Sequence, residues 1–597
     1  MKTLQLNKQP LPKQPVPDLN KTAERYLRSL KPLLNENEYN KTQELVLDFI
    51  SSEGLGSKLQ KKLLERFKNT DNWMNEWWLR SAYLEYRAPL ITNSSPGTVG
   101  PVIDFKCLDD VCIFAARLVR AVYDYSDFIR SGTIKQEMIG EIPLDMQPYA
   151  TILGTYRRPN KGSDVLLHTD ESNHIIITSN NHVSKFPMWK LKMLLNHINF
   201  TLMGTIKDIV KRSHVKATPI GILTGNNRDT WVENYNILSE LGNNKNIIDS
   251  IESSLFILCL DDNLPEEVLK DKNNASVRAV QSLTGFSSYT NAGNRWHDKT
   301  VQFIISPDGF MGMEYEHSPC EGTPIAVLHD YIWKKCLKGI YVYENNFLYL
   351  ILFLKLIILW NVFYRRHITY LFFVMLRISK DIDMECFTFN EFGADDIKMI
   401  KLSPDSFIQI AMQVTFYKLH GKSPVHYESA SLRRFKNART ECIRSTSSES
   451  VKFALIMASK DLNISNKEKK GLMIKAIQTH KQLANEAAVG EGVDRHLYGL
   501  KMIAKSEGIE LPELYKDIGY TKSTYFTLTS SQVPFKTASF MCYGPVVPDG
   551  YGCCYNPRPS NILIACSSFK SCKDTDSEKF AHILQQTLCD MKRLAST

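Results

Sequence analysis

Short apolar segments alternate with helix-like segments over two successive stretches of this chain, and this alternation is what most restricts its fold. His174–Thr178 and Leu255–Leu260 are apolar runs typical of buried strands, and both lie in a stretch from about 91 to 340. The pattern restarts near 381 and includes the strand-like run Asn561–Cys566. A length of 597 residues allows more than one domain. The sequence therefore predicts an α/β protein with two similar halves.

Capping signals mark the ends of two helices in the second half. Ser403 stands at an N-cap position with Pro404 at the first helical position, and Gly421 ends the apolar helical pattern that follows. Thr575 with Glu578 three positions later has the form of a capping box, so we expect the last helix to start at Thr575.

The segment from Phe347 to Tyr364 is almost wholly apolar and does not fit a globular pattern. Roughly 20 such residues span a bilayer, so a transmembrane helix is one interpretation. A buried core helix is a second interpretation.

Bulk composition excludes several classes of protein. The net charge is +9, but the basic residues are spread along the chain, so we expect no nucleic-acid partner. The 13 cysteines include no CxxC pair, which favours a reducing compartment and no metal site. Residues 1–17 lack the apolar core of a signal peptide, and the C-terminus lacks a peroxisomal address. The compartment stays open between cytoplasm and mitochondrion.

A single histidine, His317, stands in the run Tyr315–Gly322, after the alternating segment Val301–Ile305. This pattern is typical of a strand that ends in a loop and presents one imidazole. Histidine has the side chain whose ordinary pKa lies nearest neutral pH, which makes His317 a candidate general base. A structural role is equally compatible with one isolated histidine.

The case for catalysis depends on several other motifs, which together with His317 resemble the carnitine/choline acyltransferase family from near the N-terminus to the end. These motifs are Ser403-Pro404-Asp405, Tyr427-Glu428-Ser429-Ala430-Ser431, Arg439-Thr440, Asp494-Arg495-His496 and Thr529-Ser530-Ser531-Gln532-Val533-Pro534. The resemblance implies two related domains of the chloramphenicol-acetyltransferase type. Each would be a mixed sheet covered by helices, and the active-site tunnel would run between them.

The chain then divides into four regions. Residues 18–90 form a helical N-terminal region, 91–340 an α/β domain that carries His317, and 381–597 a second α/β domain. Residues 341–380 are the apolar segment, where the family has an ordinary charged sequence. This contrast suggests a third interpretation of the segment, a faulty gene model in which translated non-coding sequence replaces an exon.

Acyl transfer from a thioester to an alcohol needs a base, a donor for the oxyanion and an oriented alcohol. The resemblance assigns the base to His317, with Glu321 as a supporting acid, and assigns oxyanion support to Ser531. Cys320 raises the alternative of a covalent Cys/His mechanism, but the resemblance gives Cys320 no chemical role.

The resemblance also bears on which alcohol is used. Three residues match those that bind the carboxylate of carnitine in the family: Arg495, Thr440 and Tyr427. Choline has no carboxylate. A buried carboxylate needs such donors, because an unpaired buried charge is costly. Trp78 and Tyr83 match aromatic residues near the substrate. The expected alcohol is therefore carnitine, with choline as the alternative.

The acyl donor is expected to be a short-chain acyl-CoA such as acetyl-CoA, bound as a co-substrate without any permanent cofactor. Met541 matches the position whose side chain limits the acyl pocket. The resemblance assigns coenzyme A contacts to Lys398, Lys401, Asp405 and Ser431. Ala394 stands where the family usually has a lysine, which puts part of the phosphate site in doubt. A membrane-tethered or inactive acyl-CoA-binding homologue is a further alternative. We expect a monomer without stable membrane insertion.

Overall fold

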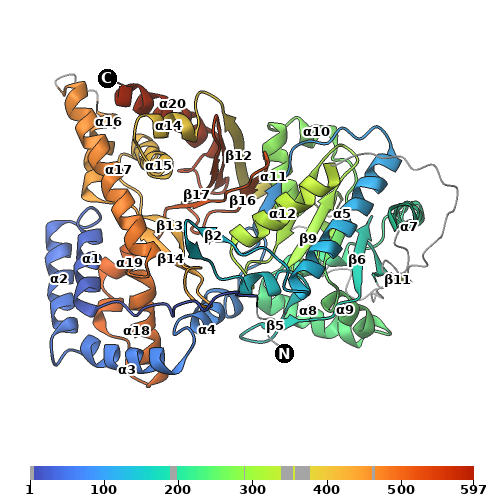
Figure 1. Ribbon diagram of the computed structural model, residues 1–597, viewed down its shortest axis with the longest axis horizontal. Coiled ribbons are helices and arrows are strands. Elements are labelled where there is room, and N and C mark those ends of the chain that lie inside the picture. Colours follow the sequence, from blue (N-terminus) through green and yellow to red (C-terminus); the bar gives the residue numbers. More distant parts are fainter. Residues whose placement is uncertain are drawn as a thin grey trace.

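The computed structural model describes residues 6–188, 198–287, 289–337, 354–356, 377–459 and 464–596. Two large mixed β-sheets carry the described part of the chain, and helices cover both of them (Figure 1). The prediction of an α/β fold with two helix-covered mixed sheets is confirmed.

The first sheet has the strand order β11-β7-β6-β8-β9-β10-β1-β16. Its centre is parallel, since β6 pairs with β8 and β8 with β9 in parallel, while the other neighbours are antiparallel. The strands are β1 (Gly97–Val99), β6 (His174–Ser179), β7 (His182–Pro187), β8 (Ile257–Leu260), β9 (Val301–Ile305), β10 (Met311–Tyr315), β11 (Leu354–Leu356) and β16 (Phe540–Cys542).

The second sheet has the order β12-β18-β17-β15-β13-β14 and the same plan of three parallel central strands with antiparallel flanks. Its strands are β12 (Ile382–Phe389), β13 (His426–Ser431), β14 (Thr440–Arg444), β15 (Leu528–Gln532), β17 (Tyr551–Pro557) and β18 (Ile562–Phe569). Two small hairpins add β2 (Met138–Ile139) with β3 (Ile142–Pro143), and β4 (Thr155–Arg158) with β5 (Val165–His168).

The helices of the first half, apart from the short α10, contribute to one large apolar core with the first sheet. They are α5 (Leu108–Arg130), α7 (Ile198–Arg212), α8 (Arg228–Glu240), α9 (Asn244–Glu252), α10 (Glu266–Leu269), α11 (Asn274–Thr284) and α12 (Gly322–Leu337), with short 3-10 turns at Gln147–Ala150, Ile220–Gly225 and Ala292–Asn294.

The second sheet has a separate apolar core, to which α15 and α20 contribute most of their buried faces. The helices of this half are α14 (Ala394–Met399), α15 (Pro404–His420), α16 (Ser448–Ala458), α17 (Asn466–Ala488), α18 (Asp494–Ser506), α19 (Ile518–Ser523) and α20 (Ser577–Ser596), with a 3-10 turn at Glu513–Tyr515.

The N-terminal helices pack on the C-terminal half of the chain rather than on the sheet that follows them. They are α1 (Leu19–Leu30), α2 (Glu36–Ile50), α3 (Leu55–Asn69), α4 (Asn75–Trp78) and the π-helical turn Leu79–Leu84. Their buried side chains share a core with α18, and Figure 1 shows α1–α3 beside α17 and α18.

Strand β16 crosses between the two halves. Although it follows β15 of the second sheet in sequence, it pairs antiparallel with β1 at the edge of the first sheet. Met541 is thereby placed opposite Thr98, and a residue from the C-terminal half becomes part of the first sheet.

The expected caps of α15 are present, whereas the expected start of the last helix is wrong. Ser403 accepts a hydrogen bond from the backbone N–H of Ser406, and Gly421 adopts φ 64° at the helix end. Helix α20 begins at Ser577, and Asp576 rather than Thr575 accepts from the N–H of Lys579. Aspartate caps helices as well as threonine does, so the competing residue one position later takes the role.

The apolar run from 347 to 364 lies largely outside the described residues. Within it only Leu354–Leu356 is described, as strand β11 paired antiparallel with β7. In the parts of the chain that the structure describes, every helix is too short or too polar to cross a bilayer.

Candidate functional site

A cavity of about 410 Å³ is lined by residues from both sheets and from the N-terminal helices. Most of the side chains that the sequence nominated line this one cavity: Trp78, Tyr83, His317, Glu321, Tyr427, Ser431, Thr440, Ser531 and Met541. Arg495 lies immediately behind this wall, and Lys398, Lys401 and Asp405 lie away from it.

His317 follows β10 and is held at the cavity wall from several directions. Its backbone N–H donates to the carbonyl of Ser94 at 3.0 Å. Its imidazole stacks with Tyr83 and with Tyr315, with ring centroids 5.5 Å apart in each pair. Burial lowers the pKa of His317, although the Glu321 carboxylate opposes this effect. The imidazole is therefore neutral near neutral pH and able to accept a proton.

Arg439 ties the loop of His317 to the second sheet, and sequence reasoning assigned it no role. Its guanidinium donates to the Glu321 carboxylate at 2.5 Å, to the carbonyl of Ser318 at 2.6 Å and to the carbonyl of His317 at 3.0 Å. Arg439 is buried, so its charge needs these partners. The sequence pointed to Arg439 only through its position next to Thr440, which was already a candidate site residue.

The opposite wall of the cavity carries a cation surrounded by hydroxyls. Nη2 of Arg495 donates to the hydroxyls of Tyr427 at 3.3 Å and Thr440 at 3.4 Å, and Nε donates to the Thr440 carbonyl at 2.8 Å. The guanidinium also lies 3.7 Å from the Trp78 ring centroid. All these hydrogen-bond acceptors are neutral, while the buried Glu441 carboxyl group lies near enough to interact with the charge of Arg495.

The polar run on β15 divides between the two faces of the strand. Ser530 donates to Gln409 at 2.9 Å and also bonds to His426 in the protein interior. Thr529 donates to the Tyr551 carbonyl. The cavity is lined by all three residues of the run, Thr529, Ser530 and Ser531. Strand alternation places Ser531 on the same face as Thr529, so its hydroxyl is available to a bound molecule from that face.

Met541 closes one part of the cavity. It is buried, and its Sδ accepts a hydrogen bond of 3.6 Å from the Tyr315 hydroxyl. A Cβ atom added to Gly322 would meet Cε and Sδ of Met541 at 3.3 Å, so this side chain packs directly against the start of α12. The methionine fills the space between β16 and the loop of His317.

The nominated coenzyme A residues are not gathered at one place. Ser431 lines the cavity, whereas Lys398 is an exposed residue of α14 that pairs with Asp395 at 3.1 Å. Lys401, in the turn before α15, has φ 60°. Asp405 lies in the first turn of α15.

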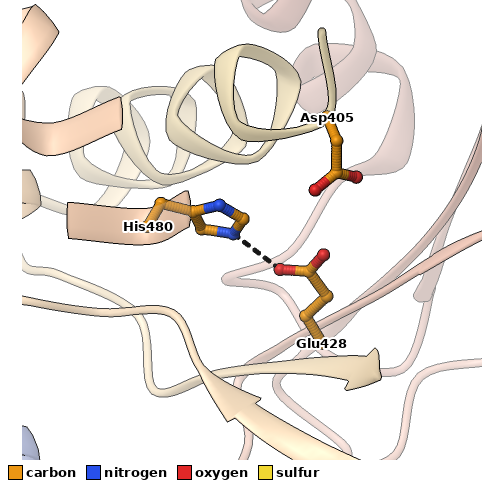
Figure 2. A group of neighbouring side chains, drawn as sticks. All are labelled: Asp405, Glu428 and His480. Atoms are coloured by element: carbon orange, nitrogen blue, oxygen red, sulfur yellow. Dashed lines mark hydrogen bonds and ion pairs between the residues drawn. The ribbon is translucent and has the colours of Figure 1, made fainter. Parts of the chain in front are cut away.

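Behind the cavity, Asp405 belongs to a buried cluster with Glu428 and His480, shown in Figure 2. Glu428 lies between Tyr427 and Ser429 on β13, and its side chain points to the face away from the cavity. His480 bonds to Glu428 at 2.7 Å and to Ser406 at 3.0 Å.

The three groups of this cluster are of metal-ligating types, and their ligand atoms lie within 4.8 Å of one another. Each already has a partner in the protein, however, since the Tyr555 hydroxyl donates to Asp405 and the Ser445 hydroxyl to Glu428. Burial, together with the Glu428 carboxylate, raises the pKa of Asp405 to about 6. The Glu428 carboxylate raises the pKa of His480 against the effect of burial.

Comparison with known proteins identifies the family of this chain. A model of the choline/carnitine O-acyltransferase family matches residues 14–586. A carnitine O-acetyltransferase of Columba livia is 40% identical over 604 residues, covering 99% of this chain and 94% of that protein. One of Mus musculus is 37% identical over 590 residues, covering 98% and 93%. A choline O-acetyltransferase of Danio rerio is 35% identical over 603 residues, covering 98% and 93%.

The fold and these matches define the chain as an acyltransferase. It belongs to the choline/carnitine O-acyltransferase family. The prediction of an enzyme of this family is confirmed.

The raised pKa of Asp405 predicts a measurable effect on stability. Because the folded-state pKa lies above the ordinary value of 3.8, the folded protein binds this proton more tightly than the unfolded chain does. The free energy of unfolding should therefore contain a contribution that is lost as pH rises through about 4 to 6. Asp405→Asn removes the titrating group, so its stability relative to the original protein should rise by on the order of 1–3 kcal/mol across this window.

Urea unfolding of both proteins at a series of pH values measures this difference. Two stability curves that run parallel across the window would show that the Asp405 carboxyl is not titrating in the folded state as described.

Proposed function

We propose that this protein transfers a short acyl group, acetyl in the first instance, between coenzyme A and carnitine, in either direction. Family membership supports acyl transfer, and the carnitine O-acetyltransferases among its relatives support the choice of substrates. The observation that carries the choice of alcohol is the guanidinium of Arg495, whose partners Tyr427, Thr440 and Trp78 line the cavity.

A cation with neutral partners beside a cavity favours an anionic ligand. Arg495 carries a full positive charge, and its hydrogen bonds go to a carbonyl and two hydroxyls. A carboxylate that entered would gain charge-assisted hydrogen bonds from this guanidinium. Carnitine has a carboxylate and choline has none, so this wall of the cavity favours carnitine.

His317 is proposed as the general base. Its Nε2 takes the proton of the carnitine hydroxyl while that oxygen attacks the carbonyl carbon of the thioester. The carbonyl oxygen becomes an oxyanion, to which the Ser531 hydroxyl donates a hydrogen bond. The carbon–sulfur bond then breaks, its electron pair leaves with the coenzyme A sulfur, and the imidazolium returns the proton to that sulfur. Glu321, with a carboxylate oxygen 3.5 Å from Nε2, stabilises the imidazolium.

Coenzyme A is proposed as a co-substrate that reaches the cavity beside Ser431. Lys398 and Lys401 supply charges suited to its phosphates, and both lie outside the cavity as a long, extended ligand requires. Asp405 is proposed to contact the same ligand from the start of α15. Ala394 at the start of α14 leaves this phosphate site with one lysine fewer than the family pattern.

A thiol-release assay with acetyl-CoA tests the proposal directly. Thiol should appear with carnitine, and much more slowly with choline. Faster release with choline would make the protein a choline acetyltransferase. No release with either alcohol would contradict acyl transfer and favour an inactive binding protein.

His317→Ala should lower turnover by about 10²- to 10⁴-fold, because it removes the proposed general base. Binding of both substrates, measured by calorimetry, should change little. His214→Ala is the control, because His214 lies at an exposed position beyond α7, where it bonds to the carbonyl of Lys211. Near-normal turnover of His317→Ala would end the proposed mechanism.

Arg495→Asn should weaken carnitine far more than acetyl-CoA. A charge-assisted contact to a carboxylate contributes about 1.5–3 kcal/mol, or roughly ten- to a hundredfold in affinity. Choline should be affected little, so the ratio of the two activities should shift toward choline. Adding Thr440→Val should increase the shift. Parallel changes with both alcohols would mean that Arg495 supports the fold and does not bind the substrate.

Met541→Gly should allow octanoyl-CoA to react, because it removes the side chain that fills the space beside Tyr315 and Gly322. The measurement is the ratio of kcat/KM for octanoyl-CoA and acetyl-CoA. Met399→Ala serves as the control, since Met399 is exposed at the end of α14. An unchanged ratio in Met541→Gly would show that another group limits the acyl chain.

A further inference from the structure

An imidazole that acts as a base through one ring nitrogen must carry its proton on the other. The surroundings of the two nitrogens of His317 therefore decide whether it can do the proposed chemistry. Nε2 lies 3.5 Å from the Glu321 carboxylate, which is too long for a hydrogen bond. Nδ1 lies 2.9 Å from the Tyr83 hydroxyl oxygen, which is a full hydrogen bond.

The direction of this hydrogen bond selects the tautomer. If the Tyr83 hydroxyl donates to Nδ1, the proton of the neutral ring must sit on Nε2, and no lone pair is left for a substrate. If Nδ1–H donates to the Tyr83 oxygen, Nε2 keeps a free lone pair. Only the second arrangement provides a base.

The phenol of Tyr83 is suited to accept this proton and is held rigidly. Burial raises the pKa of Tyr83, so its hydroxyl stays neutral. Its ring is nearly parallel to the imidazole, with an interplanar angle of 12°, and the Arg439 guanidinium lies 5.0 Å from the ring centroid of Tyr83. These contacts hold the phenol against the imidazole, with its oxygen 2.9 Å from Nδ1.

The buried Arg157 bonds to both chain segments that carry the Tyr83–His317 hydrogen bond. Arg157 donates to the carbonyl of Tyr83, to the carbonyl of Tyr86 at 3.3 Å, and to the carboxylate of Glu316 at 3.0 Å. Glu316 precedes His317 and accepts a hydrogen bond from the N–H of Ser318 at 3.2 Å. A single guanidinium thus joins the segment of Tyr83 to the loop of His317.

From these contacts we infer that Tyr83 is a positioning residue, whose phenol oxygen accepts the Nδ1–H of His317 and thereby keeps Nε2 unprotonated and available as the base. This inference rests on the proposed function, in which His317 is that base. It gives Tyr83 a role that acts through the imidazole, in addition to its place in the cavity wall.

Histidine labelled with ¹⁵N reports the tautomer without any substrate. In two-bond ¹H–¹⁵N spectra of the full chain near neutral pH, the His317 signals are those that disappear in His317→Gln. We expect the wild-type protein to show a protonated Nδ1 and an unprotonated Nε2. In Tyr83→Phe the Nε2–H form should become populated. Unprotonated Nδ1 in the wild-type protein, or an unchanged tautomer in Tyr83→Phe, would overturn the inference.

Tyr315→Phe is the matched control for the tautomer measurement. Tyr315 also stacks on the same imidazole, but its hydroxyl bonds to Met541. The tautomer should therefore stay unchanged in this variant. A change equal to that in Tyr83→Phe would assign the effect to ring packing and reject the hydrogen bond.

Kinetics of Tyr83→Phe provide a second readout. Turnover should fall by about 10- to 100-fold, the range seen when partners that orient a metal-binding imidazole are removed. Loss of the acceptor destabilises the imidazolium, so the acid limb of the kcat/KM profile should move to lower pH. The charged groups facing His317 are Glu316, Glu321 and Arg439, and all remain in the variant. The contrary result is a raised KM for carnitine while kcat and the acid limb of the kcat/KM profile stay unchanged. That result would make Tyr83 a substrate contact only.

The two hypotheses fail separately. If His317→Ala keeps its activity, the proposed function is wrong whatever the tautomer. If His317→Ala is inactive but the tautomer is the opposite one, only the role of Tyr83 is wrong.

Discussion

The buried guanidinium of Arg439 is the contact on which the arrangement of the site depends. It extends from the hairpin of β13 and β14 to the loop after β10, so it joins the second sheet to the residues that carry His317. A buried charge without partners is strongly destabilising, and Arg439 meets this requirement with the Glu321 carboxylate and two backbone carbonyls. The two sheets are therefore held in one relative position at the point where the cavity lies between them.

The cavity has two ends of different electrostatic character. At one end the charge of Glu321 is compensated by Arg439, and the neutral imidazole of His317 lies beside them. At the other end the guanidinium of Arg495 donates its hydrogen bonds to neutral groups. A molecule with a hydroxyl at one end and a carboxylate at the other would complement this distribution.

Strand alternation allows one strand to serve two purposes. On β13, Tyr427 and Ser429 face the cavity, while Glu428 between them faces α15 and α17 and bonds to His480. The same holds on β15, where Ser531 faces the cavity and Ser530 bonds to Gln409. On the face away from the cavity, polar side chains bond within the protein and hold the strands in place. On the cavity face, the alternate side chains can contact a ligand.

The sequence by itself determined some strands of each half, the caps at Ser403 and Gly421, and nine of the residues that line the cavity, because these follow from short-range patterns and from motifs. It misplaced the last helix by choosing Thr575 over Asp576, since neighbouring caps of similar strength are not separable from local sequence. Only the tertiary structure revealed Arg439, Arg157 and the hydrogen bond between Tyr83 and His317, and only it placed β16 in the first sheet. These contacts join residues that are far apart in the chain, and the distances and burial that decide them exist only once both sheets have packed.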